Sequence, residues 1–216
     1  HYGQYPQSLW RNSAVSDVYE PGSTFKIVTA SAALEEGVAR PEDTFFDPGY
    51  TIVSGVRIGC WYHGGHGSQT FIQLLENSCN PGFVELGTRL GKERFMKYIK
   101  GFGFGELTGI DLPGEARGIL DPSKVGPVEL ATITFGQGIS VTPIQIITAL
   151  STIANDGKLV QPHVAKAILD KDGNTIHEFS PAPLRQVVSY ETAQEMKRIL
   201  ESVVTNGTGG RGKIEG

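Results

Sequence analysis

Apolar positions along the chain predict several helices, and the strongest pattern lies near the N-terminus. From 25 to 34, apolar and small side chains cover nearly the whole circumference of a helix, which is typical of a helix enclosed by the core. We expect this helix to cover 23–36 and to end at Gly37, a residue that suits the left-handed conformation closing many helices. Lys26 is the only charge in the run. Because an unpaired buried lysine is costly, its presence there indicates a function.

Further helices are predicted where apolar residues recur at the helical period. They are expected over 70–76, 83–90, 92–100, 127–135, 143–154 and 190–204. The segment 143–154 is the most strongly specified, since Thr142 can cap its N-terminus and Pro143 fits its first turn. In the same way, Pro81 suits a first helical position before 83–90.

Strands are predicted where apolar and polar residues alternate. Short alternating runs at 50–53 and 55–58 lie within 40–69, a segment rich in Gly, Pro, Tyr and His. Two further runs, at 164–169 and 175–179, flank a cluster of turn residues. We interpret them as a β-hairpin and expect its strands to begin a sheet.

Length and charge narrow the possible functions. The 216 residues allow one large domain or two small ones, and the net charge of −4 with 19 scattered Lys and Arg residues disfavours a nucleic-acid partner. No apolar run approaches the roughly 18 residues that span a bilayer. We expect the sequence to be a piece of a longer protein, with any membrane anchor outside it.

Ser23 and Lys26 form the first candidate for chemistry. Residues three apart on a helix share a face, so the lysine amine can lie within hydrogen-bond reach of the serine hydroxyl. A serine becomes a nucleophile when a neighbouring base takes its proton, and burial can keep a lysine partly neutral for that purpose. The dipole of the helix N-terminus would also favour negative charge at Ser23. On this motif alone, the alternative is a helix cap followed by a lysine whose amine extends to the solvent.

Ser78 and Asn80 form the second candidate. In a loop, a spacing of two turns both polar groups to one side, while Cys79 between them faces away and needs no chemical role. Ser78 could relay a proton between the lysine and a leaving group, and Asn80 could bind a substrate amide or fix Lys26. The alternative is a capping pair in front of the following helix.

The order and spacing of three motifs resemble the transpeptidase domain of class B penicillin-binding proteins. The motifs are Tyr19-Glu-Pro-Gly-Ser-Thr-Phe-Lys, Ser78-Cys-Asn-Pro-Gly-Phe-Val-Glu-Leu-Gly and Thr134-Phe-Gly-Gln-Gly-Ile-Ser-Val-Thr-Pro-Ile-Gln. The first two contain the S-x-x-K and S-x-N patterns of these proteins and of serine β-lactamases. The resemblance covers nearly the whole chain and favours Gram-positive, clostridial-type members that act in elongation, division or sporulation.

This resemblance implies an α+β fold in which helices flank an antiparallel sheet and the S-x-x-K helix is buried at the centre. The family's third motif, K-[ST]-G on a strand of that sheet, is absent, since Gly212-Lys213-Ile214 does not match it. We therefore interpret 1–216 as a partial transpeptidase domain. The substrate-carboxylate site and half of the oxyanion hole would lie beyond it, which leaves open whether this piece is active alone.

The resemblance also implies a mechanism and partners. Ser23 would attack the D-Ala-D-Ala carbonyl of a peptidoglycan stem peptide, Lys26 would take its proton, and Ser78 with Asn80 would hold the peptide and protonate the leaving D-alanine. A second strand's amine would then complete the cross-link, and β-lactams would be trapped on Ser23. We expect the whole protein to be anchored at the extracytoplasmic face of the cell membrane and to work with a glycosyltransferase.

Two other functions would use the same motifs. A β-lactam sensor would acylate without turnover, but the Gly-Gln-Gly-x-x-Val-Thr-Pro-x-Gln segment is similar to that of the synthetic enzymes. A serine β-lactamase would need a deacylating glutamate, for which the sequence offers no convincing candidate.

A separate group of residues predicts a metal site. Cys60, His63 and His66 are three zinc-type ligands within seven residues, and Asp47 could supply the fourth if a hairpin returns it to Cys60. Some clostridial relatives are thought to carry zinc near the active site, and the resemblance points the same way. The role of the zinc ion would be structural, because it would hold together a glycine-rich loop that has little core of its own. An exposed His-Gly loop with a free thiol is the alternative.

Overall fold

The computed structural model describes residues 2–6, 10–180 and 183–214. Its α-helices are α1 (Ser13–Ser16), α2 (Lys26–Glu35), α3 (Phe71–Glu76), α4 (Asn80–Leu90), α5 (Lys92–Gly101), α6 (Pro127–Ile133), α7 (Pro143–Ala154) and α8 (Tyr190–Asn206). Short 3-10 turns include η1 (Tyr2–Gln4), η3 (Gly22–Phe25), η4 (Pro122–Lys124) and η5 (Gly210–Gly212). Strands are β1 (Thr44–Asp47), β2 (Tyr50–Val53), β3 (Val56–Gly59), β4 (Gly67–Thr70), β5 (Lys158–Val160), β6 (Ala167–Leu169), β7 (Thr175–Glu178) and β8 (Pro183–Gln186).

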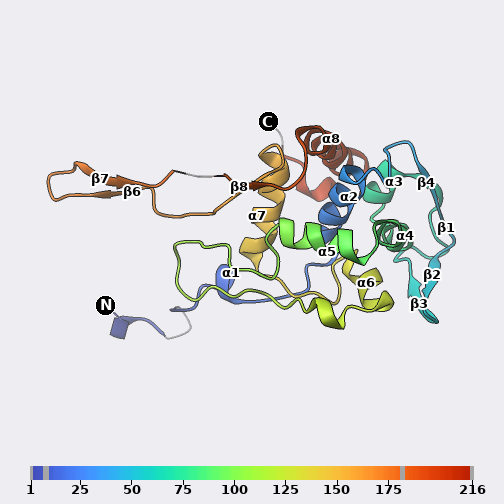
Figure 1. Cartoon of the computed structure of the whole chain (residues 1–216), viewed down its shortest axis with the longest axis horizontal. Helices are drawn as coiled ribbons and strands as arrows, with labels where there is room; N and C mark the ends of the chain where they lie inside the picture. Colours follow the sequence, from blue (N-terminus) through green and yellow to red (C-terminus); the bar gives the residue numbers. More distant parts are fainter. Residues whose placement is uncertain (1, 7–9, 181–182, 215–216) are drawn as a thin grey trace.

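Helix α2 lies inside the helical body and contacts α4, α5 and α8 (Figure 1). Three small residues, Ala30, Ala32 and Ala33, are fully buried and let these neighbours approach closely. Phe25, also fully buried, packs against Phe104 with ring centroids 5.0 Å apart. The predicted buried helix is therefore confirmed. None of the helices in the described ranges has the length and apolar character that crossing a bilayer requires.

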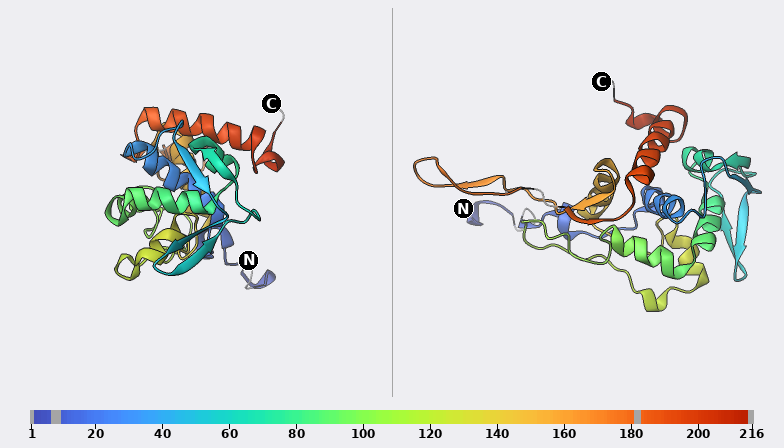
Figure 2. Two further views of the ribbon diagram at one scale, coloured as in Figure 1. Left: turned by 90° about the vertical axis from the view of Figure 1, so that its right-hand side faces the viewer. Right: turned by 45° about the horizontal axis from the view of Figure 1, so that its top comes forward.

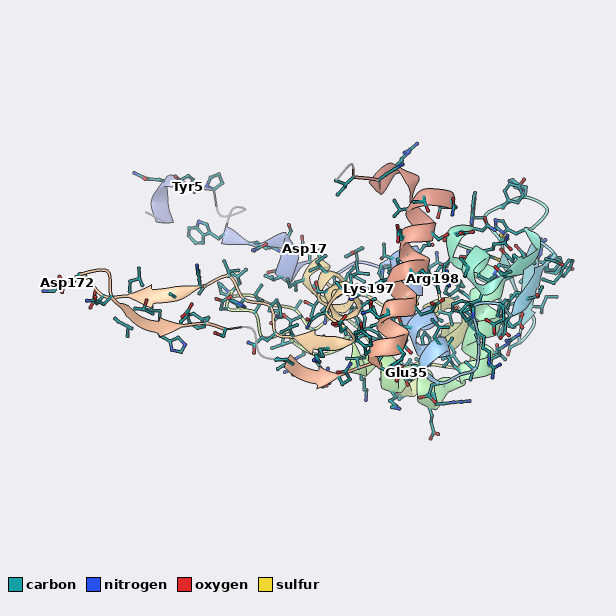
Figure 3. The ribbon with its side chains drawn as sticks, turned by 90° about the horizontal axis from the view of Figure 1, so that it is seen from above. Tyr5, Asp17, Glu35, Asp172, Lys197 and Arg198 are labelled. Atoms are coloured by element: carbon teal, nitrogen blue, oxygen red, sulfur yellow. The ribbon has the colours of Figure 1, made fainter. Side chains whose placement is uncertain are left out.

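The strands pair as four separate antiparallel sheets of two strands each: β1–β4, β2–β3, β5–β8 and β6–β7. The β6–β7 hairpin projects from the body, and Asp172 lies at its tip (Figures 1 and 3). Asp111 holds the base of the hairpin by accepting 2.7 Å hydrogen bonds from the backbone of Val164 and Ala165. Because β7 is exposed along its whole length, it has no apolar face to bury. Within the described residues, the expectation that this hairpin begins a larger sheet is wrong.

Most predicted elements are confirmed, and the differences are local. Helix α7 covers the expected segment, with reciprocal capping bonds between Thr142 and Gln145 of 3.0 and 3.3 Å. The first turn of the expected 23–36 helix is instead the 3-10 turn η3. Helix α4 begins at Asn80, earlier than expected. Figure 2 shows α8 crossing the helical body along one side.

The Gly-Gln-Gly segment braces the turn that leads into α2. Tyr19 and Val141 exchange two backbone hydrogen bonds of 2.9 Å, and Gly136 accepts another from the backbone of Gly22 at 2.9 Å. The Glu20 carboxylate accepts a 2.8 Å bond from the Gly138 backbone. The third motif of the sequence therefore holds the first motif in place.

Gly136 leaves no room for a side chain, which gives a test of this brace. Its φ is +78°, and an added Cβ would overlap the backbone of Gly22. Gly55, in the β2–β3 turn, has a similar φ of +81° but open space around it. Gly55→Ala should cost about 1–2 kcal/mol of unfolding free energy from backbone strain alone. Gly136→Ala should cost about 1–3 kcal/mol more, because the clash is with backbone.

Urea denaturation of the purified variants measures both changes. Equal losses for Gly136→Ala and Gly55→Ala would show that the close approach of Gly136 to Gly22 does not contribute to stability.

Candidate active site

The fold brings Ser23, Lys26, Ser78 and Asn80 together. Ser23 lies in the turn η3, Lys26 is the first residue of α2, Ser78 lies between α3 and α4, and Asn80 begins α4. Ser78 has a φ of +51°, a left-handed conformation that is uncommon for serine. Such strain is often found at functional sites, where the surrounding structure enforces it.

Lys26 makes three short hydrogen bonds from its amine. Nζ donates to the Ser78 carbonyl at 2.7 Å, to Ser78 Oγ at 2.9 Å and to Asn80 Oδ1 at 2.7 Å. These acceptors use all three protons of an ammonium group. Of the two roles that the sequence left open for Asn80, its contact with Lys26 matches the fixing of the lysine.

Ser23 joins this group through Ser78. The two hydroxyl oxygens lie 3.0 Å apart, with Ser78 Oγ donating to Ser23 Oγ. The sequence led us to expect a direct contact between Ser23 and Lys26, whereas the hydrogen bonds of the lysine amine go to the Ser78–Asn80 turn. The three acceptors of that turn occupy all three protons of the amine, which accounts for the difference.

Burial sets the charge balance of Lys26. The residue is only 4% exposed, and its Nζ lies 5.2 Å from the centroid of the Phe83 ring. Burial lowers the pKa of Lys26 to about 8, against smaller opposing effects from the sulfurs of Cys79 and Cys60. At neutral to mildly alkaline pH, a usable fraction of this amine is therefore neutral and able to accept a proton.

A cavity of about 240 Å³ adjoins Ser23, Lys26 and Ser78. Its other lining residues are mostly apolar and include Ile27, Leu75, Leu200 and Val203. The contribution of α8 to this wall was not predicted from the sequence. The available signal was the spacing of Leu200 and Val203, which lie three apart on one face of this amphipathic helix.

A second cluster lies directly behind the Ser78–Asn80 turn. The ligand atoms of Asp47, Cys60, His66 and Cys79 all lie within 4.8 Å of one another. Cys79 Sγ donates to Asp47 Oδ2 at 3.3 Å, and His66 Nδ1 lies 3.0 Å from the same oxygen and 3.3 Å from Cys60 Sγ. Oxygen, nitrogen and sulfur donors at this separation suit a tetrahedral zinc ion.

The cluster corrects the expected ligand set at one position. His63 is exposed on the 61–66 loop and does not belong to the cluster, whereas Cys79 does. Cys79 faces away from Ser78 and Asn80, as expected, and its sulfur meets the carboxylate of Asp47. The side turned away from Lys26 is occupied by Asp47, a buried residue that the spacing of the motif could not reveal.

The charges of the second cluster are also perturbed. Burial raises the pKa of Asp47, but hydrogen bonds from Cys60, Gly49 and His66 outweigh it and bring the pKa down to about 2. Burial raises the pKa of the Cys79 thiol to about 12. It also raises the pKa of the Cys60 thiol. Without metal the cluster therefore holds one carboxylate and two protonated thiols.

Comparisons with known proteins agree with this geometry. The family model described as penicillin binding protein transpeptidase domain matches residues 2–216. Stage V sporulation protein D of Bacillus subtilis is 54% identical over 98% of this chain and 33% of its own length. Penicillin-binding protein PbpB of Mycobacterium tuberculosis is 38% identical over 89% of this chain and 28% of its own length.

Solved structures show the same fold. Penicillin binding protein 3 from Mycobacterium tuberculosis, complexed with aztreonam, superposes with a TM-score of 0.87 at 36% identity, covering 95% of this chain and 47% of that one. The D,D-transpeptidase domain of a peptidoglycan glycosyltransferase from Eggerthella lenta gives a TM-score of 0.88 at 30% identity, covering 95% and 53%. The expected α+β transpeptidase fold is thus confirmed.

The chain spans about a third of the length of the curated relatives it matches. The match nevertheless extends over nearly all of its residues, and the three motifs meet at one site. The chain belongs to the penicillin-binding protein transpeptidase family.

Proposed function

We propose that the protein is a serine-type peptidoglycan D,D-transpeptidase that forms its acyl-enzyme on Ser23. The observation that carries this proposal is the hydrogen-bonded path from Ser23 Oγ through Ser78 Oγ to the amine of Lys26. The path ends on an amine whose pKa is lowered to about 8, so that part of it is neutral at mildly alkaline pH. Oriented hydroxyl groups and a tuned base are what an acyl transfer to serine requires.

Proton transfer along this path requires the hydrogen bonds to reverse. With Lys26 charged, its amine donates to Ser78, and Ser78 donates to Ser23. With Lys26 neutral, Ser23 can donate to Ser78 Oγ, and Ser78 can donate to the free lone pair of the amine. The Ser23 proton then moves through Ser78 to Lys26 as Ser23 Oγ bonds to the substrate carbonyl carbon.

The remaining steps use the same groups. Collapse of the tetrahedral intermediate breaks the bond to the terminal D-alanine, whose nitrogen takes the proton back from Lys26 through Ser78. The acceptor amine then attacks the acyl carbon, loses a proton to the same base and restores the Ser23 hydroxyl. The backbone N–H of Ser23 would contribute to the oxyanion hole, where one donor is typically worth about 3–4 kcal/mol.

The wider role follows from the relatives' names. The name Stage V sporulation protein D supports a role in sporulation, and we propose sporulation or division as the setting. We propose peptidoglycan stem peptides as substrates, β-lactams as inhibitors, an extracytoplasmic location with a membrane anchor, and a glycosyltransferase as partner. A β-lactam sensor or a serine β-lactamase would use the same residues, so turnover of the acyl-enzyme must distinguish them.

Labelling with a fluorescent penicillin tests this function. The intact protein should take up one label that persists for hours, and Ser23→Ala should abolish it because the nucleophile is lost. Ser31→Ala is the matched control, since Ser31 lies in α2 and only donates to the Ile27 carbonyl at 2.7 Å. Labelling should survive that change.

Rapid loss of the label would instead indicate a β-lactamase. Persistent label in Ser23→Ala would exclude Ser23 as the acylated residue. A lasting label without cross-linking of stem peptides in the intact protein would favour the sensor.

We also propose that Asp47, Cys60, His66 and Cys79 hold a structural zinc ion. Four ligands of zinc-binding type converge there, and two of them are thiols that would be deprotonated on metal binding. When bound, the ion would fix the 47–67 segment, which is rich in glycine and has little apolar core. The cluster residues would thereby hold the Ser78–Asn80 turn from behind.

Metal analysis distinguishes this ligand set from the one expected from the sequence. The purified protein should contain about one zinc per chain. Cys60→Ser should lose it, because a thiolate ligand is removed, whereas His63→Ala should retain it, because His63 lies outside the cluster. Absence of zinc from the wild-type protein prepared without chelators would refute the site, and loss from His63→Ala would refute this ligand set.

A further inference from the structure

Gln69 carries a buried polar atom without a partner. The residue lies in β4, is 3% exposed, and its Nε2 makes no hydrogen bond to any described residue. Its other amide atom, Oε1, accepts a 3.1 Å hydrogen bond from Asn77 Nδ2. Leaving a buried N–H unpaired costs about 1–3 kcal/mol. An acceptor that came within reach of this N–H in another state of the protein would remove that cost.

The nearby acceptor is the sulfur of Cys79. Gln69 bonds to Asn77, two residues before Cys79, and its strand β4 places Gly67 opposite Asp47 of the cluster. The Gln69 side chain also lowers the pKa of the Cys79 thiol, although burial dominates and raises it. In the metal-free state this thiol is protonated and donates to Asp47. A neutral thiol is a weak acceptor, whereas a thiolate carries the charge that an amide N–H would satisfy.

The Gln69 amide turns its oxygen to Asn77, which donates through Nδ2, and this arrangement leaves Nε2 as the free donor of the amide. Asn77 is itself held by Trp61, whose Nε1 donates to the Asn77 carbonyl at 2.9 Å. Since Asn77 directly precedes Ser78, the hydrogen bond between Asn77 and Gln69 joins β4 to the start of the catalytic turn.

We propose that Gln69 is the outer hydrogen-bond donor to the Cys79 thiolate when the cluster binds a divalent metal. The inference rests on the zinc site proposed above and concerns a residue outside its four ligands. On metal binding, Cys79 releases its proton to solvent, its sulfur lone pair bonds to the metal, and Gln69 Nε2–H donates to the sulfur. Gln69 is thus a positioning residue that acts through Cys79.

A pair of glutamine-to-glutamate changes isolates this hydrogen bond. Gln69→Glu keeps an oxygen for Asn77 but removes the donor, so zinc should bind about 10–100-fold more weakly, as for other outer-shell changes. Gln73→Glu is the control, because Gln73 is exposed in α3 and needs only its oxygen to accept from the Thr70 backbone. Its zinc affinity should not change. Competition with a chromogenic chelator measures both dissociation constants.

Two further readouts keep the inference testable if Gln69→Glu does not fold. Gln69→Met, which also lacks the donor but adds no charge, should weaken zinc binding and shift the thiolate-to-metal absorption of the cobalt-loaded protein to lower energy. In wild-type protein with isotope-labelled glutamine, loading a spin-active cadmium isotope should produce scalar coupling between the metal and one Gln69 amide proton.

The outcomes separate the two proposals. If the wild-type protein binds neither zinc nor cobalt, the metal site fails and the inference fails with it. If the wild-type protein binds metal but the Gln69 variants bind it equally well with unchanged cobalt spectra, the role of Gln69 alone is refuted. Absence of the amide coupling in cadmium-loaded wild-type protein would refute it as well.

Discussion

The enclosure of one amine at the start of α2 is the constraint on which the active site depends. Lys26 is nearly inaccessible to water, and desolvation makes its charged form less favourable. Three oxygen acceptors from the Ser78–Asn80 turn compensate part of that cost. Burial, against the smaller opposing effects of the Cys79 and Cys60 sulfurs, lowers the pKa of the amine to about 8, low enough to accept a proton and high enough to return it.

Two close packing arrangements keep the nucleophile and the lysine in register. Before Ser23, the backbone of Gly22 lies against Gly136 at a distance that only glycine permits. Beyond Lys26, the strained Ser78 sends its hydroxyl and carbonyl toward the amine. Cys79 faces the opposite way, into the Asp47 cluster. A change in that cluster would therefore reach the catalytic turn directly through Cys79.

The sequence predicted those parts of the molecule whose signals are local. Helix α7 was predictable because Thr142 and Pro143 specify its first turn. The conjunction of Ser23, Lys26, Ser78 and Asn80 followed from the resemblance of the motifs. By contrast, β4 consists of Gly67-Ser-Gln-Thr, which has no apolar alternation, and it forms only because β1 lies beside it.

Non-local contacts account for what the sequence did not predict. Cys79 contacts Asp47, which lies 32 positions away, so no spacing rule could rank it above His63 as a metal ligand. The route from Ser23 to Lys26 through Ser78 depends on contacts between residues 55 and 52 positions apart, which give no local sequence signal. The apolar wall from α8 likewise depends on how that helix packs against α2 and α3.

The most direct test of the central claim is the titration of the Lys26 amine itself. In protein with isotope-labelled lysine side chains, NMR follows each amine against pH, and Lys26→Arg identifies the Lys26 signal by its loss. Burial of the amine predicts a midpoint at about 8. A midpoint near the ordinary lysine value of 10.5 would contradict it, because the amine would then stay charged and could not accept the Ser23 proton.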